Sequence, residues 1–279
     1  MVILVADSGA TKCEWCLLKG NKKLAVITQG LSPYFLNTSQ IEAILRNELL
    51  PSLKNPTVDL VYFYGTGCLN PANAKIVQKA IKAVFGDAEI HVSHDLMGAA
   101  KALCGNEKGI ACILGTGSNS CFYNGKKIVR NSPGIGYVLG DEGSGAYLGK
   151  KVIQYYLYKT FDEDLRYKFD QKYQLTSVDI LENVYKKPLP NRYLASFTLF
   201  LSENRGHYMV ENIIEDGLND FFYYHLCKYG ESWTHPIHFV GGVSFAFKDT
   251  LQELCNGYEF TLGKIIKNPM EGLIDYHKS

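Results

Sequence analysis

Three short segments place glycine beside hydroxyl or charged residues at the end of an apolar run. They are Asp7-Ser8-Gly9-Ala10-Thr11-Lys12, Gly115-Thr116-Gly117-Ser118-Asn119 and Gly241-Gly242-Val243-Ser244. Glycine lets backbone N–H groups turn toward an anion without an intervening Cβ atom, while Thr and Ser add donors and Lys12 adds charge. One such turn by itself is more often an ordinary tight turn. Three of them favour a nucleotide clamped between two lobes.

The carboxylate of Asp7 adds to the first loop, because it directly follows the apolar run 2–6. Mg²⁺ is usually held by one or two carboxylates together with several waters, so a carboxylate beside a phosphate-binding turn suits this ion. The loops match neither of two common nucleotide fingerprints. The sequence has no G-x-x-x-x-G-K-[ST], and the first two loops connect strand to strand instead of strand to helix.

A further turn, Gly65-Thr66-Gly67-Cys68, is almost a copy of the segment 115–118. It precedes a helix that begins at Pro71, and not a hairpin. Two interpretations stay open, in which the turn either lines the site of the phosphoryl acceptor or simply joins a strand to a helix.

Asp95 directly follows the apolar strand 90–93 and stands at the start of a predicted helix. One interpretation is an N-cap, and the other is a general base that takes a proton from an attacking hydroxyl during phosphoryl transfer. A single residue can do both, because a helix N-terminus favours a charged carboxylate. The spacing alone does not separate the two.

The segment Gly140-Asp141-Glu142-Gly143-Ser144 carries two adjacent acids between glycines, after the apolar residues 137–139. It is a poor solvent loop and a poor helix. It suits the wall of a polar ligand site, where carboxylates accept hydrogen bonds from several hydroxyl groups. A helix-capping role is the alternative.

The first hundred residues predict three leading strands followed by alternating helices and strands. The order is β-β-β-α-β-α-β-α, with strands at 2–6, 13–18, 24–28, 58–64 and 90–93 and helices at 38–50, 71–85 and 95–104. Pro51 is expected to end the first helix. Such an order implies a mixed sheet with helices on its faces.

The second half repeats this beginning, with a strand, a glycine turn and a hairpin. The expected elements are strands at 110–114, 120–123, 127–130 and 236–240, helices at 146–157 and 244–255, and mostly helical chain between them. We interpret this as a distant duplication with a helical insertion in the second copy. The predicted domains are residues 1–107 and 108–279, and the fold class is α/β.

Composition limits the partners. With 29 Lys and Arg against 28 Asp and Glu, the net charge is +1. Binding to nucleic acid or to an anionic membrane requires a basic surface, so neither is expected as a partner. The apolar runs are strand-sized, so neither a membrane span nor an export signal is expected. The eight cysteines lie mostly in apolar runs, which favours reduced thiols and a cytoplasmic protein.

These residues together resemble the sugar kinases of the actin/hexokinase/heat-shock ATPase superfamily. The chain is most similar to the N-acetylglucosamine kinase-like branch of the BadF/BadG/BcrA/BcrD ATPase family, over essentially its whole length. The resemblance rests on the three glycine loops, Ser93-His94-Asp95, and the segment Gly134-Ile135-Gly136 with Gly140–Ser144. It implies two ribonuclease H-like (actin-like ATPase) domains flanking a nucleotide cleft.

The resemblance also implies a role for each matching position. Transfer of the γ-phosphoryl group from MgATP to the 6-hydroxyl of an amino sugar would use Asp95 as catalytic base and sugar ligand. The nucleotide and its Mg²⁺ would be bound by Asp7, Gly9, Thr11, Lys12, Gly115, Thr116, Gly117, Gly241 and Gly242, with Asp7 holding Mg²⁺ through water. The sugar would be bound by Ser118, Asn119, Gly134, Gly136 and Asp141.

Two departures from the family pattern concern the sugar and not ATP. Ile135 stands where the vertebrate-type enzyme has Trp, and Leu31-Ser32-Pro33 leads to Tyr34 where that enzyme has a sugar-binding Asn. N-acetylglucosamine is therefore the first expected acceptor, with glucosamine, N-acetylmuramic acid and other hexose derivatives open.

Two other functions occur on this fold. The same family includes iron–sulfur ATPases that activate CoA-linked dehydratases or reductases, but their cluster-binding cysteine has no counterpart in residues 140–145. A non-catalytic sugar-sensing regulator would usually carry a DNA-binding segment before the first loop, which here begins at residue 7. The aromatic residues between 155 and 229 are expected to form helix-packing core, and some are candidates for a homodimer surface.

Overall fold

The computed structural model describes residues 1–9, 12–54 and 56–278, and the chain forms two compact units. Unit 1 comprises Met1–Asn106 and Pro269–Ser279, and unit 2 comprises Glu107–Asn268. The predicted second domain, 108–279, is thus wrong at its C-terminal end. The last segment belongs to unit 1 because its helix α14 (Met270–Lys278) packs on β1 and β2 of that unit.

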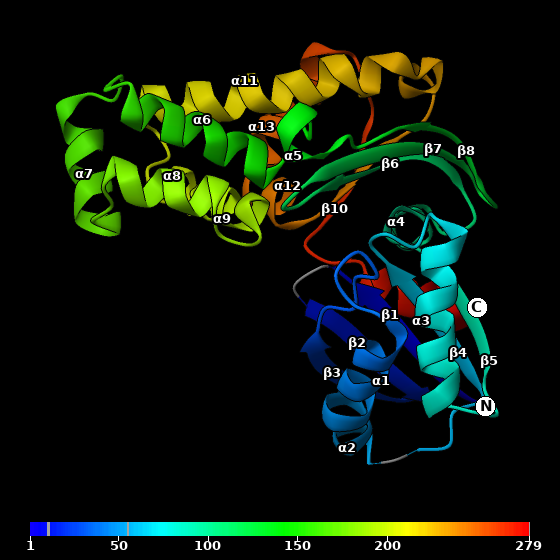
Figure 1. Cartoon of the computed structure of the whole chain (residues 1–279). Helices are drawn as coiled ribbons and strands as arrows, with labels where there is room; N and C mark the ends of the chain where they lie inside the picture. The colour runs from blue at the N-terminus through cyan, green and yellow to red at the C-terminus, as the bar shows by residue number, and fades with distance from the viewer. Residues whose placement is uncertain (10–11, 55, 279) are drawn as a thin grey trace. The chain divides into compact units, whose positions relative to one another are not determined.

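Unit 1 is built on a five-stranded sheet whose central strand, β1, lies antiparallel to β2 and parallel to β4 (Figure 1). The strand order is β3-β2-β1-β4-β5. The bounds are β1 Val2–Ser8, β2 Lys12–Lys19, β3 Lys22–Gln29, β4 Leu60–Gly65 and β5 Glu89–His94. Along the chain, the strands and helices follow one another in the predicted order, β-β-β-α-β-α-β-α.

Both faces of the unit 1 sheet are covered, because β1 is apolar at nearly every position. Leu4 and Ala6 point into a core with Trp15, Phe63 and the helices α1 (Thr38–Ile44) and α3 (Pro71–Val84). Since side chains alternate along a strand, Ile3 and Val5 face the other side, where α4 (Asp95–Cys104) and α14 pack against β1.

Pro51 does not end the first helix, contrary to the prediction. The chain continues from α1 through a π-helical turn, η1 (Leu45–Leu49), into α2 (Leu50–Leu53), and it stops at Lys54 with a left-handed φ of 60°. Pro51 lies in the first turn of α2, where a residue without an N–H is tolerated. The π-helical turn changes the hydrogen-bond pattern just before it.

Unit 2 repeats the topology of unit 1. Its sheet has the order β10-β9-β6-β7-β8, in which β6 is central, antiparallel to β7 and parallel to β9. The bounds are β6 Lys108–Leu114, β7 Ser118–Asn124, β8 Ile128–Ser132, β9 Ile237–Val240 and β10 Leu262–Ile266. The two sheets support the predicted duplication, although β10 and α14 were not predicted.

A helical insertion lies between β8 and β9 of unit 2 (Figure 1, green to yellow). Its helices are α5 Gly136–Leu139, α6 Gly145–Leu157, α7 Glu163–Tyr173, α8 Ser177–Tyr185, α9 Pro190–Ser196, α10 Thr198–Glu203, α11 Tyr208–Tyr224, η2 Leu226–Lys228 and η3 Gly230–Trp233. Phe169, Phe197 and Phe200 are fully buried, and the Phe169 ring contacts both of the others, as expected of packing core. The single helix predicted over residues 244–255 is divided into two helices, α12 Gly242–Ala246 and α13 Lys248–Gly257.

None of the helices in the described part of the chain combines the length and the apolar character that a membrane crossing requires. The eight cysteines all lie in the described ranges, and none of them forms a disulfide. Cys13 is buried on β2, and burial raises the pKa of its thiol, so it is a structural side chain in this unit.

Candidate functional site

In unit 1 the candidate residues lie at one edge of the sheet, where three parallel strands end. Ser8, Gly65 and His94 are paired in register across β1, β4 and β5. The chain just beyond this row carries Thr66 and Asp95, and the Thr66 N–H donates to the Ser8 carbonyl over 2.9 Å. The carboxyl edge of parallel strands is the usual ligand side of an α/β sheet.

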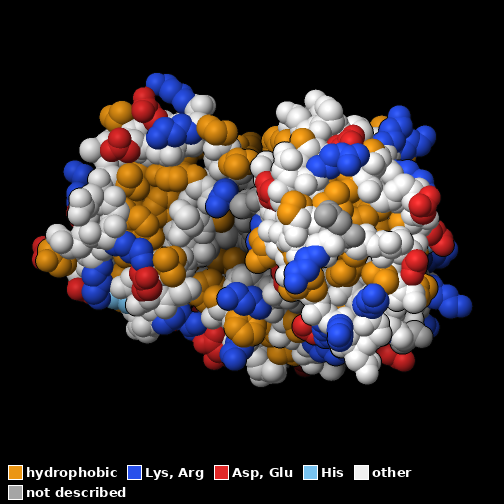
Figure 2. All heavy atoms as spheres, turned by 90° about the horizontal axis from the view of Figure 1, so that it is seen from below, with side chains coloured by type: hydrophobic (Ala, Val, Ile, Leu, Met, Phe, Trp, Pro, Cys, Tyr) orange, Lys and Arg blue, Asp and Glu red, His pale blue; other side chains and the backbone are white. Residues whose placement is uncertain are grey.

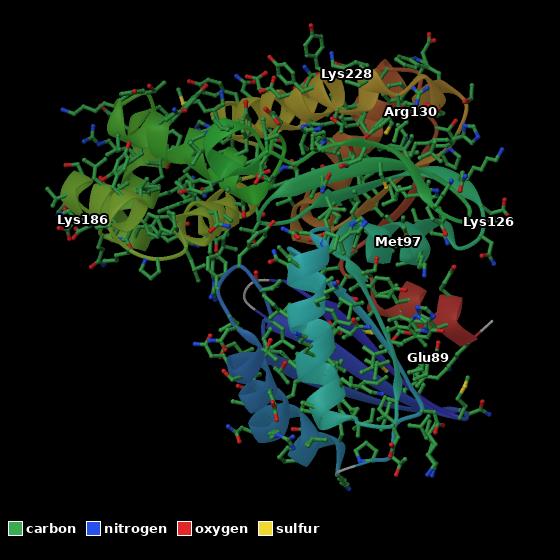
Figure 3. All side chains as sticks on the ribbon, turned by 45° about the vertical axis from the view of Figure 1, so that its right-hand side comes forward. Glu89, Met97, Lys126, Arg130, Lys186 and Lys228 are labelled. Carbon is green, nitrogen blue, oxygen red and sulfur yellow. The ribbon has the colours of Figure 1, made fainter. Side chains whose placement is uncertain are left out.

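Asp95 is the first residue of α4, and His94 occupies the N-cap position, so the predicted N-cap role of Asp95 is wrong. Figure 3 labels Met97 in the first turn of this helix. Asp95 Oδ2 accepts a 2.8 Å hydrogen bond from the Thr66 hydroxyl, and Oδ1 accepts from the Leu96 N–H at 2.9 Å. Each oxygen retains a lone pair, and the carboxylate is half-buried. The sequence left two interpretations of the turn that contains Thr66, and the structure shows that the Thr66 hydroxyl orients the Asp95 carboxylate.

Asp7 lies on β1 close enough to Asp95 for their charges to repel. Burial first, and then the Asp95 and Glu14 carboxylates, raise the pKa of Asp7 to about 7, while Lys12 opposes this effect. A desolvated carboxylate beside a second one is a hard oxygen donor that a divalent cation would satisfy, so the donor set fits Mg²⁺. No group of three or more possible metal ligands occurs among the described residues.

The raised pKa of Asp7 predicts a stability cost in the ligand-free protein. The Asp7 pKa is about 7 in the folded state and 3.8 in the unfolded chain, so the folded state holds the proton more tightly. The free energy of unfolding that this group contributes is therefore lost as pH rises from 3.8 through about 7. Asp7→Asn should therefore raise the thermal midpoint at about pH 8 and change it little at about pH 4. Glu89→Gln is the matched control, because Glu89 is an exposed acid on β5 of the same unit and does not contribute to the raised Asp7 pKa. Equal thermal midpoints for Asp7→Asn and the parent at the higher pH would contradict the raised pKa of Asp7.

The remaining residues of the first loop are only partly described. Thr11 lies outside the described residues. The N–H of Gly9 donates to the carbonyl of Lys12 over 3.0 Å, which closes the turn between β1 and β2. Gly9 and Lys12 are exposed.

In unit 2 the second and third glycine loops come together. Gly241, at the end of β9, has φ 133° and ψ 166°, and a Cβ atom there would lie 2.1 Å from the Leu114 carbonyl and 3.1 Å from the Gly115 nitrogen. Only glycine allows this approach. The loop is also tied to α6, since Gly145 and Ala146 donate to the carbonyls of Gly115 and Thr116.

Thr116 lies at the exposed tip of this loop. Its hydroxyl has no hydrogen bond to any residue that the structure describes. A Cβ atom added to Gly242, the first residue of α12, would meet no other atom within 4 Å, so the surroundings of this residue are open. Backbone N–H groups at a loop and a helix start, with room beside them, form a cradle that fits phosphate groups.

The predicted sugar-binding residues form a second cluster in unit 2. Asp141 Oδ1 accepts from the Gly136 N–H over 3.2 Å, and a Cβ atom on Gly134 would lie 2.4 Å from the Ser118 carbonyl and 3.4 Å from Asp141 Oδ1. Burial raises the pKa of Asp141, while the backbone N–H groups of Gly136 and Ser118 act in the opposite direction and lower it. Asp141 is only 9% exposed, so it organises this segment in addition to any contact with a ligand.

Ser118 and Asn119 are the other two predicted sugar ligands. The Ser118 hydroxyl is buried without a hydrogen-bond partner in the described residues. The Asn119 side-chain oxygen is occupied, since it accepts from the Ser120 N–H and from Asn131 Nδ2, both at 2.9 Å. Ser118 therefore has a free donor, whereas Asn119 has only its amide NH₂ group for a ligand.

Sequence reasoning missed three residues around the unit 2 clusters, Asn131, His225 and Tyr229, and it left the turn that contains Thr66 between two interpretations. The histidines show no metal-binding spacing in the sequence, and His225 and Tyr229 follow their partners by about a hundred residues. No short-range signal in the sequence connects them.

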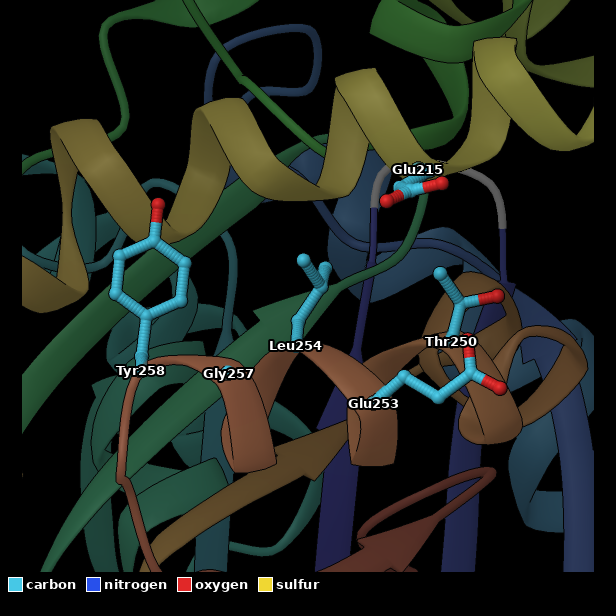
Figure 4. A pocket seen from close by; sticks show the side chains of 6 residues that line it. All are labelled: Glu215, Thr250, Glu253, Leu254, Gly257 and Tyr258. Atoms are coloured by element: carbon cyan, nitrogen blue, oxygen red, sulfur yellow. The ribbon is translucent and has the colours of Figure 1, made fainter.

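The structure shows two further surface features. On the face in Figure 2, basic and acidic side chains are scattered among neutral ones without a continuous field of either sign. A separate pocket of about 270 Å³ lies between α11 and α13, lined by Glu215, Thr250, Glu253, Leu254, Gly257 and Tyr258 (Figure 4). None of the predicted site residues lines it.

Comparison with solved structures identifies the class. A ROK-family glucokinase from Streptomyces griseus, solved with glucose and AMPPNP, aligns over 100% of this chain and 98% of its own, with TM-score 0.58 and 14% identity. An inferred N-acetylglucosamine kinase from Chromobacterium violaceum aligns over 99% and 98%, with TM-score 0.77 and 18% identity. These likenesses show the two-domain fold of sugar kinases and actin-like ATPases.

The family follows from a nearer relative. An inferred N-acetylglucosamine kinase from Porphyromonas gingivalis is 42% identical, aligns over 99% of this chain and 98% of its own, and has a TM-score of 0.94. The chain belongs to the N-acetylglucosamine kinase-like branch of the BadF/BadG/BcrA/BcrD ATPase family. No family model and no curated protein matches it.

Proposed function

We propose that this chain is an ATP-dependent sugar kinase that transfers the γ-phosphoryl group to the 6-hydroxyl of an amino sugar, with N-acetylglucosamine as the first candidate. The observation that carries the proposal is the placement of Asp95. A carboxylate at a helix N-terminus, oriented by Thr66 and beside the ends of three parallel strands, has the position and free lone pairs of a general base.

The proposed chemistry assigns Asp95 to accept the proton of the sugar 6-hydroxyl as its oxygen attacks the γ-phosphorus. The P–O bond to the β-phosphate breaks, and ADP leaves with that electron pair. Thr66 keeps the accepting carboxylate in one orientation through its 2.8 Å hydrogen bond. Such positioning is a large part of catalysis in phosphoryl transfer.

The nucleotide is assigned to the glycine loops: Asp7, Gly9, Thr11 and Lys12 in unit 1, and Gly115, Thr116, Gly117, Gly241 and Gly242 in unit 2. The close approach of Gly241 to Leu114, and the open space at Gly242, support a backbone cradle for phosphate and adenosine. Mg²⁺, when bound, neutralises charge on the phosphates. Asp7 would hold it through water, and the cation would oppose the effects of burial and of the neighbouring carboxylates, which raise the Asp7 pKa.

The sugar is assigned to Asp95, Ser118, Asn119, Gly134, Gly136 and Asp141. The buried, unpartnered Ser118 hydroxyl supports this assignment, because such a group gains a full hydrogen bond when a polar ligand binds. The 42% identical relative from Porphyromonas gingivalis, an inferred N-acetylglucosamine kinase, supports an amino sugar. Cytoplasmic location is part of the same proposal, which fits the absence of disulfides among the eight described cysteines.

A coupled ADP-release screen tests the function. The panel is glucose, glucosamine, N-acetylglucosamine, N-acetylmannosamine and N-acetylmuramic acid, each with MgATP. We expect sugar-dependent ADP release that is greatest for an N-acyl amino sugar. Release that is the same with and without every sugar would contradict the proposal.

Thr116→Val should weaken nucleotide binding more than sugar binding. The hydroxyl is exposed and has no hydrogen bond to a described residue, so its loss should cost little stability and should raise the Kd for ATP about 5- to 10-fold. Titration calorimetry with each ligand separately measures both values. A larger loss of sugar affinity than of ATP affinity would mean that the two ligands are wrongly assigned.

A further inference from the structure

A chain of buried and part-buried hydrogen bonds connects the residues that flank the predicted sugar-binding segment of unit 2. It begins at Glu142, whose Oε2 lies 3.0 Å from His225 Nε2, and continues from His225 Nδ1 to the Ser132 hydroxyl at 2.9 Å. Glu142 follows Asp141 directly, and Ser132 is the last residue of β8, two residues before Gly134. Both ends of the segment 134–141 are thus connected through one imidazole.

Tyr229 extends this chain to the other predicted sugar ligands. The Ser132 N–H donates to its phenol oxygen over 2.5 Å, and the phenol donates to the Ser120 carbonyl over 3.0 Å. The Ser120 hydroxyl lies 2.9 Å from the same oxygen. A phenol has one proton and two lone pairs, so this geometry uses its full capacity. Burial raises the pKa of Tyr229, which keeps the proton in place.

The Tyr229 hydroxyl bridges two residues that are already partners in the sheet. Ser120 and Ser132 face each other across β7 and β8. Asn131 Nδ2 donates to Asn119 Oδ1 and to the Ser120 carbonyl, the same carbonyl that accepts from Tyr229, so Asn119 is connected to this network. His225 is 4% exposed and stacks on Phe221 of α11, with ring centroids 4.9 Å apart, so it has one orientation.

The backbone conformation of Asp141 gives a reason for this hydrogen-bond network. Its φ is 59°, the left-handed region that non-glycine residues adopt only when the surroundings hold them there. The bond from Glu142 to His225 fixes the backbone on one side of Asp141, and the Gly136 N–H holds its carboxylate on the other.

We propose that His225 and Tyr229 are positioning residues of the sugar-binding wall, which set affinity for the sugar and leave the nucleotide site unchanged. The helical insertion of unit 2 thereby supplies the support for residues 118–120 and 134–141. This inference rests on the proposed function, because it assigns those residues to the sugar.

The test uses Tyr229→Phe and His225→Phe, which remove hydrogen bonds and keep a ring in each position. The matched controls are Tyr258→Phe, which loses a 2.8 Å bond to Asn219, and His207→Phe, which loses a 2.9 Å bond to Asp162, both within unit 2. We expect each test variant to raise the sugar KM about 10-fold while the ATP KM changes by less than about twofold. The controls should lower the thermal midpoint comparably and leave both KM values near the parental ones.

The double variant separates a shared chain from two independent contacts. Because both residues act through Ser132, the loss in sugar kcat/KM for the pair should be smaller than the product of the single losses. His225→Gln, which can still donate to Glu142, should recover part of the sugar affinity. An unchanged sugar KM in both test variants, or equal rises in the sugar and ATP KM values, would overturn the inference. A parental protein without sugar-dependent activity would instead overturn the proposed function, and the inference with it.

Discussion

Asp95→Asn should lower kcat for sugar phosphorylation by about 10²–10⁴, the usual contribution of a general base. The substitution keeps the size of the side chain and the oxygen that accepts from Thr66, and it loses only the acceptor of the Leu96 N–H, so the fold should persist. It removes the carboxylate charge that makes the group basic. ATP affinity, measured by calorimetry, should stay within about twofold of the parental value, because the nucleotide is assigned to other residues.

The control for Asp95→Asn is Glu89→Gln, labelled in Figure 3, at the far end of β5, the strand that leads into Asp95. Glu89 pairs with exposed His91 and lies away from the strand ends that carry the site, so this change should leave kcat unaltered. If Asp95→Asn retains more than half of the parental kcat, Asp95 is not the base. Thr66 then has no catalytic carboxylate to orient.

Gly241→Ala should have the largest structural effect of any single methyl addition near the site. The Cβ atom would lie 2.1 Å from the Leu114 carbonyl, and the backbone angles of Gly241 are accessible essentially only to glycine. Strain and displacement together should cost about 3–4 kcal/mol, which corresponds to a thermal midpoint about 10 °C lower. The shift of Leu114 and Gly115 should also raise the ATP KM about 10-fold or more.

Gly242→Ala is the matched control one residue away. No atom lies within 4 Å of the new methyl group, and Gly242 begins α12 with ordinary backbone angles. Its thermal midpoint should stay within about 2 °C of the parent. Equal midpoints for the two variants would show that β6 and β9 do not approach each other as described.

Much of unit 1 could be predicted, because its information is local. Apolar runs bounded by glycine and proline indicate the strands, and Asp7 and Asp95 stand out because each directly follows such a run. The contact between Thr66 and Asp95 follows from the register of β4 and β5, which the sequence does not specify. That is why the turn 65–68 stayed open between two interpretations.

The errors have physical causes that a single sequence does not reveal. Pro51 is predicted to end a helix, but a π-helical turn places it where its missing N–H is harmless. Chain order alone assigns the segment 269–279 to the second domain, whereas α14 packs on the first sheet. Gly134 is assigned to the sugar, and the structure adds a packing reason, the close approach to Ser118.

The support beneath the sugar segment was beyond prediction for a different reason. His225 and Tyr229 bond to Glu142, Ser132 and Ser120, which precede them by 83 to 109 residues. Nothing in the composition of the aromatic helices distinguishes these two side chains from core residues. Only the fold of the insertion shows which phenol and which imidazole reach the sheet.

The most direct test of the central claim is the identity of the product formed from MgATP and the best sugar of the screen. Proton–phosphorus correlation NMR with mass spectrometry should show one phosphate on the sugar 6-oxygen, in equal amount to the ADP released. ADP accompanied only by inorganic phosphate, or phosphate on another hydroxyl, would contradict the assignment of Asp95 as the base for the 6-hydroxyl.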